Sequence, residues 1–293
     1  MDSMEMIMRF STFMKRRSYS KDTIKSYTNN IRRFYTWLDI QFDKVISEDV
    51  YEYLGYLHNR RLNPKSINSY LTALHKFFDF LYYEEKMKIL NPVKPEYRQR
   101  EPKPLPRFLR DEEIEILIDS IKNKRDRAMC MLMLRCGLRV GEVAKLTLRA
   151  IDFKNRRIFV FNGKGPKDRI VYFSEDTYEA IKKYLRVRPS TRVKRLFLVE
   201  KGLYKGKPIS LRGIQKRIEY YAKKFGVTVS CHRLRHTMAT QLLNADAMLV
   251  SVQELLGHNS IISTQRYCKV SNEKVRRDYF KAMEVVMKRN ANV

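Results

Sequence analysis

Charged and imidazole side chains crowd one short stretch of the sequence, SCHRLRHTMATQLL at positions 230–243. Read as a helix with 3.6 residues per turn, this stretch has an apolar stripe made of Leu234, Met238, Ala239, Leu242 and Leu243. His232, Arg235 and His236 fall on or beside that stripe. A guanidinium on the buried side of a helix costs several kcal/mol unless an anion pairs with it. The stretch therefore predicts an anion next to Arg235.

The anion next to Arg235 has two possible sources. No acidic residue occurs between Arg233 and Asn244, so an acid from another segment would have to reach it. The other source is a ligand, because the start of a helix presents free N–H groups and favours negative charge. His232 and Arg235 are three positions apart and share one face of the first turn. A phosphate is the expected ligand.

A second arginine with possible chemistry is Arg139, in the segment CGLRVGEVAKL. Gly137 ends one expected helix, and Glu142 lies three residues after Arg139, at the start of another. One interpretation is a surface ion pair between Arg139 and Glu142, which stabilises little. The other is a second guanidinium held near a helix start, with Glu142 supporting it. Two guanidinium groups can bind both non-bridging oxygens of one phosphodiester.

A lysine, a histidine and a tyrosine complete the set of candidate residues. Lys164 lies in NGKGPKDR, at the expected tip of a β-hairpin, where neighbouring glycines allow close approach to another molecule. His258 follows Gly257, the expected end of a helix, and Tyr267 comes nine positions later. Taken singly, each has an ordinary structural interpretation, as a solvated lysine, a residue after a helix end, or a packed tyrosine.

The charge balance points to a polyanionic partner. Sixty Lys and Arg against 32 Asp and Glu give a formal net charge of +28, spread along the chain. Nucleic acid is the favoured partner over a membrane surface, although a ribosomal or nucleoid-packing protein would share this excess. No apolar run approaches the ~20 residues of a membrane span, and the first residues do not resemble a secretory signal. A cytoplasmic, nucleoid-associated location is expected.

Two domains are expected in a chain of 293 residues. Helical stripes over 4–14, 20–39, 47–57 and 66–85 predict a small bundle, with Ser20 and Ser47 as N-caps. The segment 91–108 carries five of the nine prolines and lacks an apolar period, which is typical of a stiff linker. We expect a helical domain at 1–95, a linker at 96–108 and a second domain at 109–293.

The second domain has mixed secondary structure. We expect a helix capped by Asp111 and a buried helix ended by Gly137. Strands over 156–161 and 168–173 should form a hairpin, and helices should follow at 175–187, 211–225, 232–245 and 248–256, with an amphipathic helix at 272–289. None of the four cysteines forms a CxxC pair, so neither a zinc site nor a disulfide framework is expected.

Five motifs in order carry a resemblance to a known family. GLRVGE, GKGPKD, HRLRHTMAT, LGH and TQRY occur in this order between positions 137 and 267. They resemble the motifs of the tyrosine recombinase (phage integrase) family, and the N-terminal part is similar to the family's core-binding domain. The resemblance implies a mainly α fold with a small antiparallel sheet. It would consist of an N-terminal SAM-like helical bundle and an α+β catalytic domain.

The resemblance implies six catalytic residues, which are Arg139, Lys164, His232, Arg235, His258 and Tyr267. Tyr267 would attack the scissile phosphate and form a 3′-phosphotyrosyl link. Lys164 would protonate the leaving 5′ oxygen, and His232 would help the phenol to lose its proton. The two arginines and His258 would stabilise the charge of the transition state. Neither a metal ion, nor another cofactor, nor ATP is expected to take part.

The resemblance also implies partners and a biological role. The expected partner is duplex DNA carrying a short inverted repeat, bound by a homotetramer whose subunits exchange contacts through the C-terminal helix. We expect no arm-binding domain ahead of the bundle, and this expectation favours an Xer-type recombinase that resolves chromosome or plasmid multimers. An integrase or resolvase of a mobile element remains an alternative. A relaxing enzyme like topoisomerase IB and a non-catalytic DNA-binding protein are further alternatives.

Overall fold

The computed structural model divides the chain into two compact units, Met1–Lys103 and Pro104–Val293. It describes residues 3–102, 108–161, 168–226 and 228–257, together with 278–281, 283, 284 and 287 near the C-terminus. Most of the final helix expected at 272–289 lies outside the described residues, and the described ones among them are helical. Among the helices that can be described, none is long and apolar enough to cross a bilayer.

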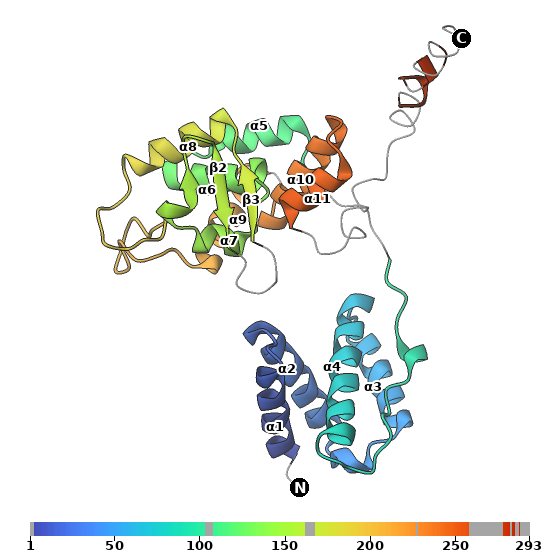
Figure 1. The fold of residues 1–293 in the computed structure, drawn as a ribbon. Coiled ribbons are helices and arrows are strands. Elements are labelled where there is room, and N and C mark those ends of the chain that lie inside the picture. Colours follow the sequence, from blue (N-terminus) through green and yellow to red (C-terminus); the bar gives the residue numbers. More distant parts are fainter. Residues whose placement is uncertain are drawn as a thin grey trace. The chain divides into compact units, whose positions relative to one another are not determined.

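The N-terminal unit is a bundle of four α-helices, which confirms the sequence-based prediction (Figure 1). The helices are α1 (Ser3–Arg16), α2 (Lys21–Leu38), α3 (Ser47–Asn59) and α4 (Pro64–Tyr83). α2 contacts each of the other three. Aromatic side chains fill much of the core, and the ring of Phe10 meets the ring of Phe77 edge to face, with 5.4 Å between centroids.

The helix starts in this unit are set by side-chain capping. Ser20 accepts a hydrogen bond from the backbone N–H of Thr23, as predicted. The prediction for Ser47 was wrong by one residue, because Ile46 occupies the N-cap position. The carboxylate of Asp49 accepts from the backbone N–H of Ile46, so an acid in the first turn does the capping in place of a serine hydroxyl.

Part of the proline-rich segment is fastened to the N-terminal unit. The Asn68 amide on α4 donates to the carbonyl of Gln99 at 2.9 Å and accepts from the Gln99 N–H at 2.8 Å. It also donates to the carboxylate of Glu101 at 2.8 Å. The Asn68 side chain therefore pairs with this stretch of chain much as a strand edge would. Residues 99–101 are held on the bundle by these bonds.

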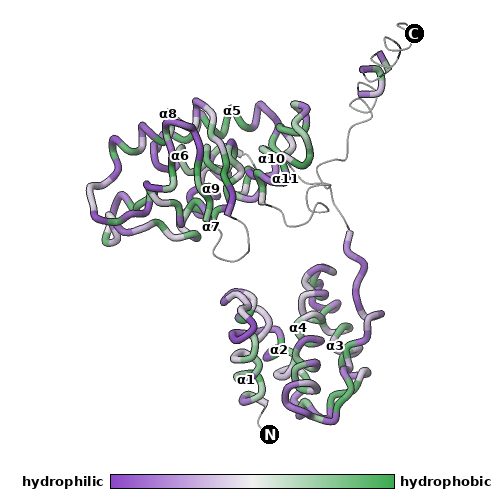
Figure 2. Tube along the Cα trace, in the orientation of Figure 1, coloured by the Kyte–Doolittle hydropathy of each residue, from purple (hydrophilic) through white to green (hydrophobic). Residues whose placement is uncertain are grey.

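The second unit is built around α6 (Lys124–Arg135), which contacts four other helices. These are α7 (Val140–Lys145), α8 (Glu175–Leu185), α9 (Leu211–Lys224) and α10 (Cys231–Asn244). All seven residues 128–134 are at most 2% exposed, as the prediction of a buried helix requires. Figure 2 shows this concentration of hydrophobic residues along α6. The remaining helices are α5 (Asp111–Ser120), which begins one residue after the N-cap Arg110, and α11 (Leu249–Leu256).

A three-stranded antiparallel sheet lies in the second unit, with the order β1–β2–β3. Its strands are β1 (Ile151–Asp152), β2 (Arg157–Val160) and β3 (Arg169–Tyr172). β2 and β3 are the predicted hairpin, with Ile158 paired to Val171, and both of these side chains are buried. β1 was not predicted, because two residues are too few to show an alternating pattern. The helical bundle and the small sheet confirm the predicted fold class.

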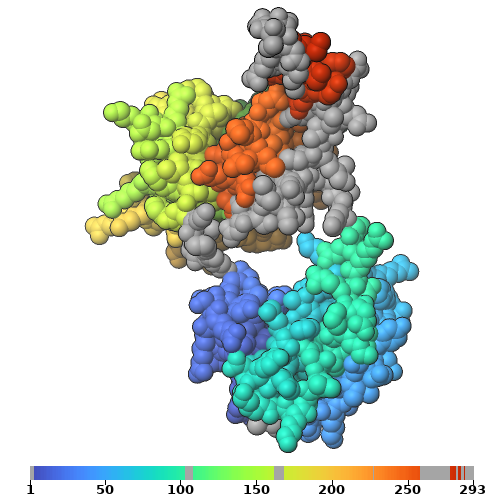
Figure 3. Space-filling model, turned by 45° about the vertical axis from the view of Figure 1, so that its right-hand side comes forward, coloured from blue at the N-terminus to red at the C-terminus, as the bar shows by residue number. Residues whose placement is uncertain are grey.

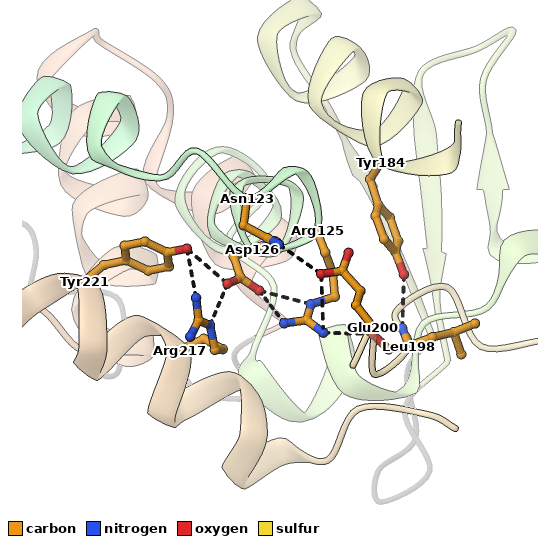
Figure 4. A network of polar contacts seen from close by, with 8 residues as sticks. All are labelled: Asn123, Arg125, Asp126, Tyr184, Leu198, Glu200, Arg217 and Tyr221. Carbon is orange, nitrogen blue, oxygen red and sulfur yellow. Dashed lines mark hydrogen bonds and ion pairs between the residues drawn. The ribbon is translucent and has the colours of Figure 1, made fainter. Parts of the chain in front are cut away.

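A buried network of charges joins α6 to α9 (Figure 4). The Asp126 side chain is fully buried and accepts hydrogen bonds from Arg125 on α6 and from Arg217 and Tyr221 on α9. Arg125 also donates to the carbonyl of Leu198, in the segment between α8 and α9. The network fixes the N-terminal end of α6 against two other segments. Its directional hydrogen bonds define their orientation more specifically than apolar contacts would.

We expect Asp126→Ala to lower the free energy of unfolding by about 3–5 kcal/mol, because it leaves the buried guanidinium of Arg125 and the partly exposed one of Arg217 without their carboxylate. Chemical denaturation followed by circular dichroism measures this. Asp152→Ala is the control, since Asp152 also accepts hydrogen bonds from an arginine and from Asn155 but is not fully buried, so its loss should lower the stability much less. Equal losses in the two variants would contradict a special contribution from the buried network.

Candidate active site

Three of the six predicted catalytic residues, Arg139, His232 and Arg235, lie among the described residues. The other three, Lys164, His258 and Tyr267, lie outside the described residues. The chain position of two of them is nevertheless bracketed by described elements. Lys164 belongs to the connection between β2 and β3, and His258 directly follows Gly257 at the end of α11.

Arg235 is the largest fully buried side chain in the described part of the protein, at 2% exposure. Ser230 caps the start of α10 by accepting from the N–H of Arg233, and this places Arg235 in the second turn, facing the core. Its two terminal nitrogens donate to the carbonyl oxygens of Gly137 and Leu256. Sequence reasoning considered an acid or a phosphate as the partner and overlooked backbone carbonyls, which spacing in a sequence does not reveal.

Arg139 occupies the N-cap position of α7 and is held on two sides. One terminal nitrogen donates to Glu142 at 2.9 Å, and the other donates to the carbonyl of Gly257 at 3.1 Å. The Glu142 carboxylate also accepts from the backbone N–H of Arg139 at 2.7 Å. The Arg139 side chain keeps 40% of its surface exposed. It is therefore a fixed cation with an open face, not a loose surface pair.

The two candidate arginines meet at one point of the fold, the C-terminal end of α11. Arg235 donates to Leu256, and Arg139 donates to the next carbonyl, that of Gly257. Gly257 has φ of +58°, which turns the chain sharply there. The carbonyl groups at a helix end carry partial negative charge and favour cations. Two segments far apart in sequence thus present guanidinium groups beside the residue that precedes His258.

Sequence reasoning missed a third arginine, Arg169, the first residue of β3. Its two terminal nitrogens bind the two carboxylate oxygens of Glu142, each at 2.8 Å, and its Nε donates to the carbonyl of Leu255 at 2.8 Å. Only 6% of the side chain is exposed. A signal was present in the sequence, because strand alternation places Arg169 on the same face as the apolar Val171.

Glu142 is the carboxylate between Arg139 and Arg169. Burial by itself would raise the pKa of Glu142, but the hydrogen bonds and charges of Arg169, followed by those of Arg139, bring this pKa below its ordinary value. Its contribution to stability is therefore present above the ordinary carboxylate pKa and is lost as the pH falls through the lowered one. Glu142 is ionised at neutral pH and balances one of the three arginine charges.

His232 is exposed in the first turn of α10, where a ligand at the helix start can reach it. Its ring lies 4.1 Å from that of His236, measured between centroids, with the two planes 70° apart. The surface formed by α10 and α11, coloured orange in Figure 3, adjoins the surface of the segment that contains β3. Arg139 and Arg235, which both donate to the end of α11, form a cationic centre suited to a phosphate, and Arg169 supports it from the buried side.

The described residues contain no cluster of His, Cys, Asp and Glu side chains that could hold a metal ion. Cys130, Cys136 and Cys231 are buried thiols, and burial raises the pKa of Cys130 to about 12. Such thiols are protonated at neutral pH and suit packing better than nucleophilic chemistry.

Residues 107–274 match the phage integrase family, and residues 7–85 match the N-terminal SAM-like domain of phage integrases. Tyrosine recombinase XerC of Staphylococcus haemolyticus (strain JCSC1435) is 33% identical over 277 residues, which cover 91% of this chain and 92% of the relative. Among solved structures, the XerA recombinase is 27% identical, with a TM-score of 0.54 and coverage of 96% of this chain and 99% of that one.

A further solved structure, the Tn1549 transposon integrase in complex with transposon right end DNA, has a TM-score of 0.78. It is 20% identical and covers 95% of this chain and 98% of that one. At this identity the likeness shows a shared fold. Both units of the chain therefore have counterparts among the solved structures.

Proposed function

This chain belongs to the phage integrase family, and from that premise we propose that it is a site-specific DNA recombinase of the Xer type. It cuts and rejoins duplex DNA through a covalent tyrosine intermediate. The observation that carries the proposal is the convergence of Arg139 and Arg235 on the end of α11, directly before His258. A net charge of +28 suits a polyanionic substrate.

The proposed reaction exchanges one phosphodiester for another. The phenolic oxygen of Tyr267 forms a bond to the scissile phosphorus, and the bond from phosphorus to the 5′ oxygen breaks. The 3′ end of the DNA is then linked to the tyrosine, and the released 5′ oxygen takes a proton from Lys164. Attack by a 5′ hydroxyl of the partner strand reverses these steps. The number of phosphate ester bonds is unchanged, so the cycle needs no ATP.

The residues assigned to the site have separate roles in this reaction. Arg139 and Arg235 bind the non-bridging oxygens of the phosphate and stabilise their charge as the phosphorane-like transition state forms. His258 adds a further hydrogen-bond donor. His232 assists removal of the proton from Tyr267, whose phenol otherwise ionises near pH 10. Glu142 keeps Arg139 oriented, since it contacts both the side chain and the backbone of that residue.

Trapping of the covalent intermediate tests the proposed function. On a nicked site DNA that loses a short fragment after cleavage, we expect a protein–DNA complex that survives denaturation and a free 5′ hydroxyl on the fragment. The yield of covalent complex should be the same in the presence of EDTA, because each proposed step is assigned to protein side chains and none to a metal ion. A product with a 5′ phosphate, or no covalent complex on any DNA that the protein binds, would overturn the proposal.

Duplex DNA with a short inverted repeat is the proposed substrate, bound by four copies of the chain with the C-terminal segment docked on a neighbouring subunit. Sedimentation of the DNA complex with and without residues 274–293 measures whether the C-terminal segment is needed for this assembly.

The resemblance to XerC favours resolution of chromosome or plasmid multimers, in the cytoplasm at the nucleoid. A role in a mobile element is the alternative. Strand exchange between two sites would distinguish a recombinase from a relaxing enzyme.

A further inference from the structure

Three arginines donate to three successive carbonyl oxygens at the end of α11. Arg169 binds Leu255 at 2.8 Å, Arg235 binds Leu256, and Arg139 binds Gly257 at 3.1 Å. The last carbonyls of a helix have no partners within the helix, and cations near them are stabilising. Two of these arginines are assigned to the phosphate, whereas Arg169, at 6% side-chain exposure, is turned away from solvent.

Arg169 also packs tightly against Gly257. A Cβ atom added to Gly257 would lie 3.0 Å from Cδ of Arg169, 3.2 Å from its Nη1 and 3.3 Å from its Nε. The backbone of Gly257, with φ of +58°, disfavours other residues independently. The turn that leads to His258 therefore packs against the side chain of Arg169, and its carbonyl groups accept hydrogen bonds from Arg139 and Arg235.

We propose that Arg169 is a positioning residue for DNA cleavage, which holds Glu142 and the end of α11 in the arrangement that orients Arg139. The inference rests on the proposed recombinase function. Arg169 occupies both oxygens of Glu142 from the buried side, so Arg139 shares only one of them through its side chain. The remaining hydrogen-bonding capacity of Arg139 stays available for the phosphate.

Loss of Arg169 should redirect Arg139. The buried Glu142 carboxylate would then have Arg139 as its remaining arginine partner, and the pair would close on itself instead of meeting the phosphate. Because burial raises the pKa of Glu142 and Arg169 is the first of the groups that lower it, that pKa should rise in the variant. The backbone N–H of Arg139 donates to the Glu142 carboxylate, and protonation of Glu142 would weaken that hydrogen bond.

The test compares Arg169→Gln, Arg169→Lys and the control Arg157→Gln in single-turnover cleavage of nicked site DNA. Arg157 lies on the neighbouring strand and pairs with Asp152 at 2.8 Å, away from Glu142. We expect Arg169→Gln to cleave about 10- to 100-fold more slowly, by analogy with the loss of a partner that orients a metal ligand. DNA binding should be retained, the acid limb of the rate should move to higher pH, Arg169→Lys should be intermediate, and Arg157→Gln should be unaffected.

A double variant separates positioning from simple loss of stability. If closure of Arg139 on the Glu142 carboxylate is the cause, adding Glu142→Gln to Arg169→Gln should slow cleavage no further, and the loss of thermal stability should not parallel the loss of rate. Wild-type rates and an unmoved pH profile in Arg169→Gln would overturn the inference, as would a rate loss matched by equal losses in DNA binding and thermal stability.

The carboxyl carbon NMR shift of Glu142 gives a readout that needs no cleavage. It should titrate at higher pH in Arg169→Gln than in the wild type, and an unchanged titration would overturn the inference by itself. If the wild-type protein forms no covalent complex, the proposed function fails and the role in cleavage fails with it, while the titration still reports whether Arg169 controls Glu142. The two failures are thereby distinguishable.

Discussion

In the Tyr267→Phe variant we expect complete loss of the covalent protein–DNA complex, with binding to the same DNA retained. Phenylalanine has nearly the shape of tyrosine but lacks the oxygen that forms the new bond to phosphorus. The cationic centre around Arg139 and Arg235 is unchanged in this variant, so the electrostatic part of DNA binding should persist. The variant therefore separates chemistry from recognition more cleanly than any change to a charged residue.

Denaturing gel electrophoresis on nicked site DNA measures the covalent product, and a mobility shift on intact DNA measures binding. Tyr51→Phe is the matched control, because Tyr51 lies on α3 in the N-terminal unit and is 67% exposed. This control should form the covalent complex at the wild-type level. A Tyr267→Phe protein that remains attached to nicked DNA would refute the assignment of the nucleophile and would leave another hydroxyl or thiol to be found.

The helices were predictable because their signals are local. The apolar stripes of the N-terminal helices follow the 3.6-residue period, whereas α6 is signalled by a continuous apolar run, and Ser20 caps its helix as expected. The prediction for Ser47 failed within the same logic, because Asp49 competes as a cap two residues later. β1 was missed because its pairing with β2 depends on tertiary placement and its two residues carry no pattern of their own.

The site was only partly predictable, and the reason is physical. Residue type and order predicted Arg139, Arg235 and a supporting role for Glu142, and the structure places Glu142 in contact with Arg139. The partners of Arg235 are the carbonyl oxygens of Gly137 and Leu256. Because every residue has a backbone carbonyl, the amino-acid sequence does not indicate which ones Arg235 binds. Arg169 has no distinctive signal in the sequence beyond its place in a strand. Its role depends on an ion pair with Glu142, which forms only when β3 packs near α7.

The second large effect is expected for Arg235→Ala, which should slow cleavage by about 100-fold or more. The guanidinium is proposed to bind an oxygen whose negative charge increases in the transition state, so its loss affects the rate more than the binding of uncleaved DNA. The measurement is single-turnover cleavage of nicked site DNA at saturating protein, with the dissociation constant determined in parallel. Near-normal cleavage by this variant would rule out the two-arginine site.

Arg235 also has a structural function, and the choice of variants must separate the two. Alanine leaves a cavity and removes the donors to Gly137 and Leu256, so Arg235→Ala should unfold at a lower temperature. Arg235→Lys keeps a positive charge and most of the volume. Its single ammonium group cannot contact two carbonyls and a phosphate at once, as the planar guanidinium group can. If charge alone mattered, the lysine variant would cleave almost normally. We expect instead that it binds DNA well, unfolds between the alanine variant and the wild type, and still cleaves far more slowly, because the planar guanidinium aligns the phosphate with the attacking oxygen.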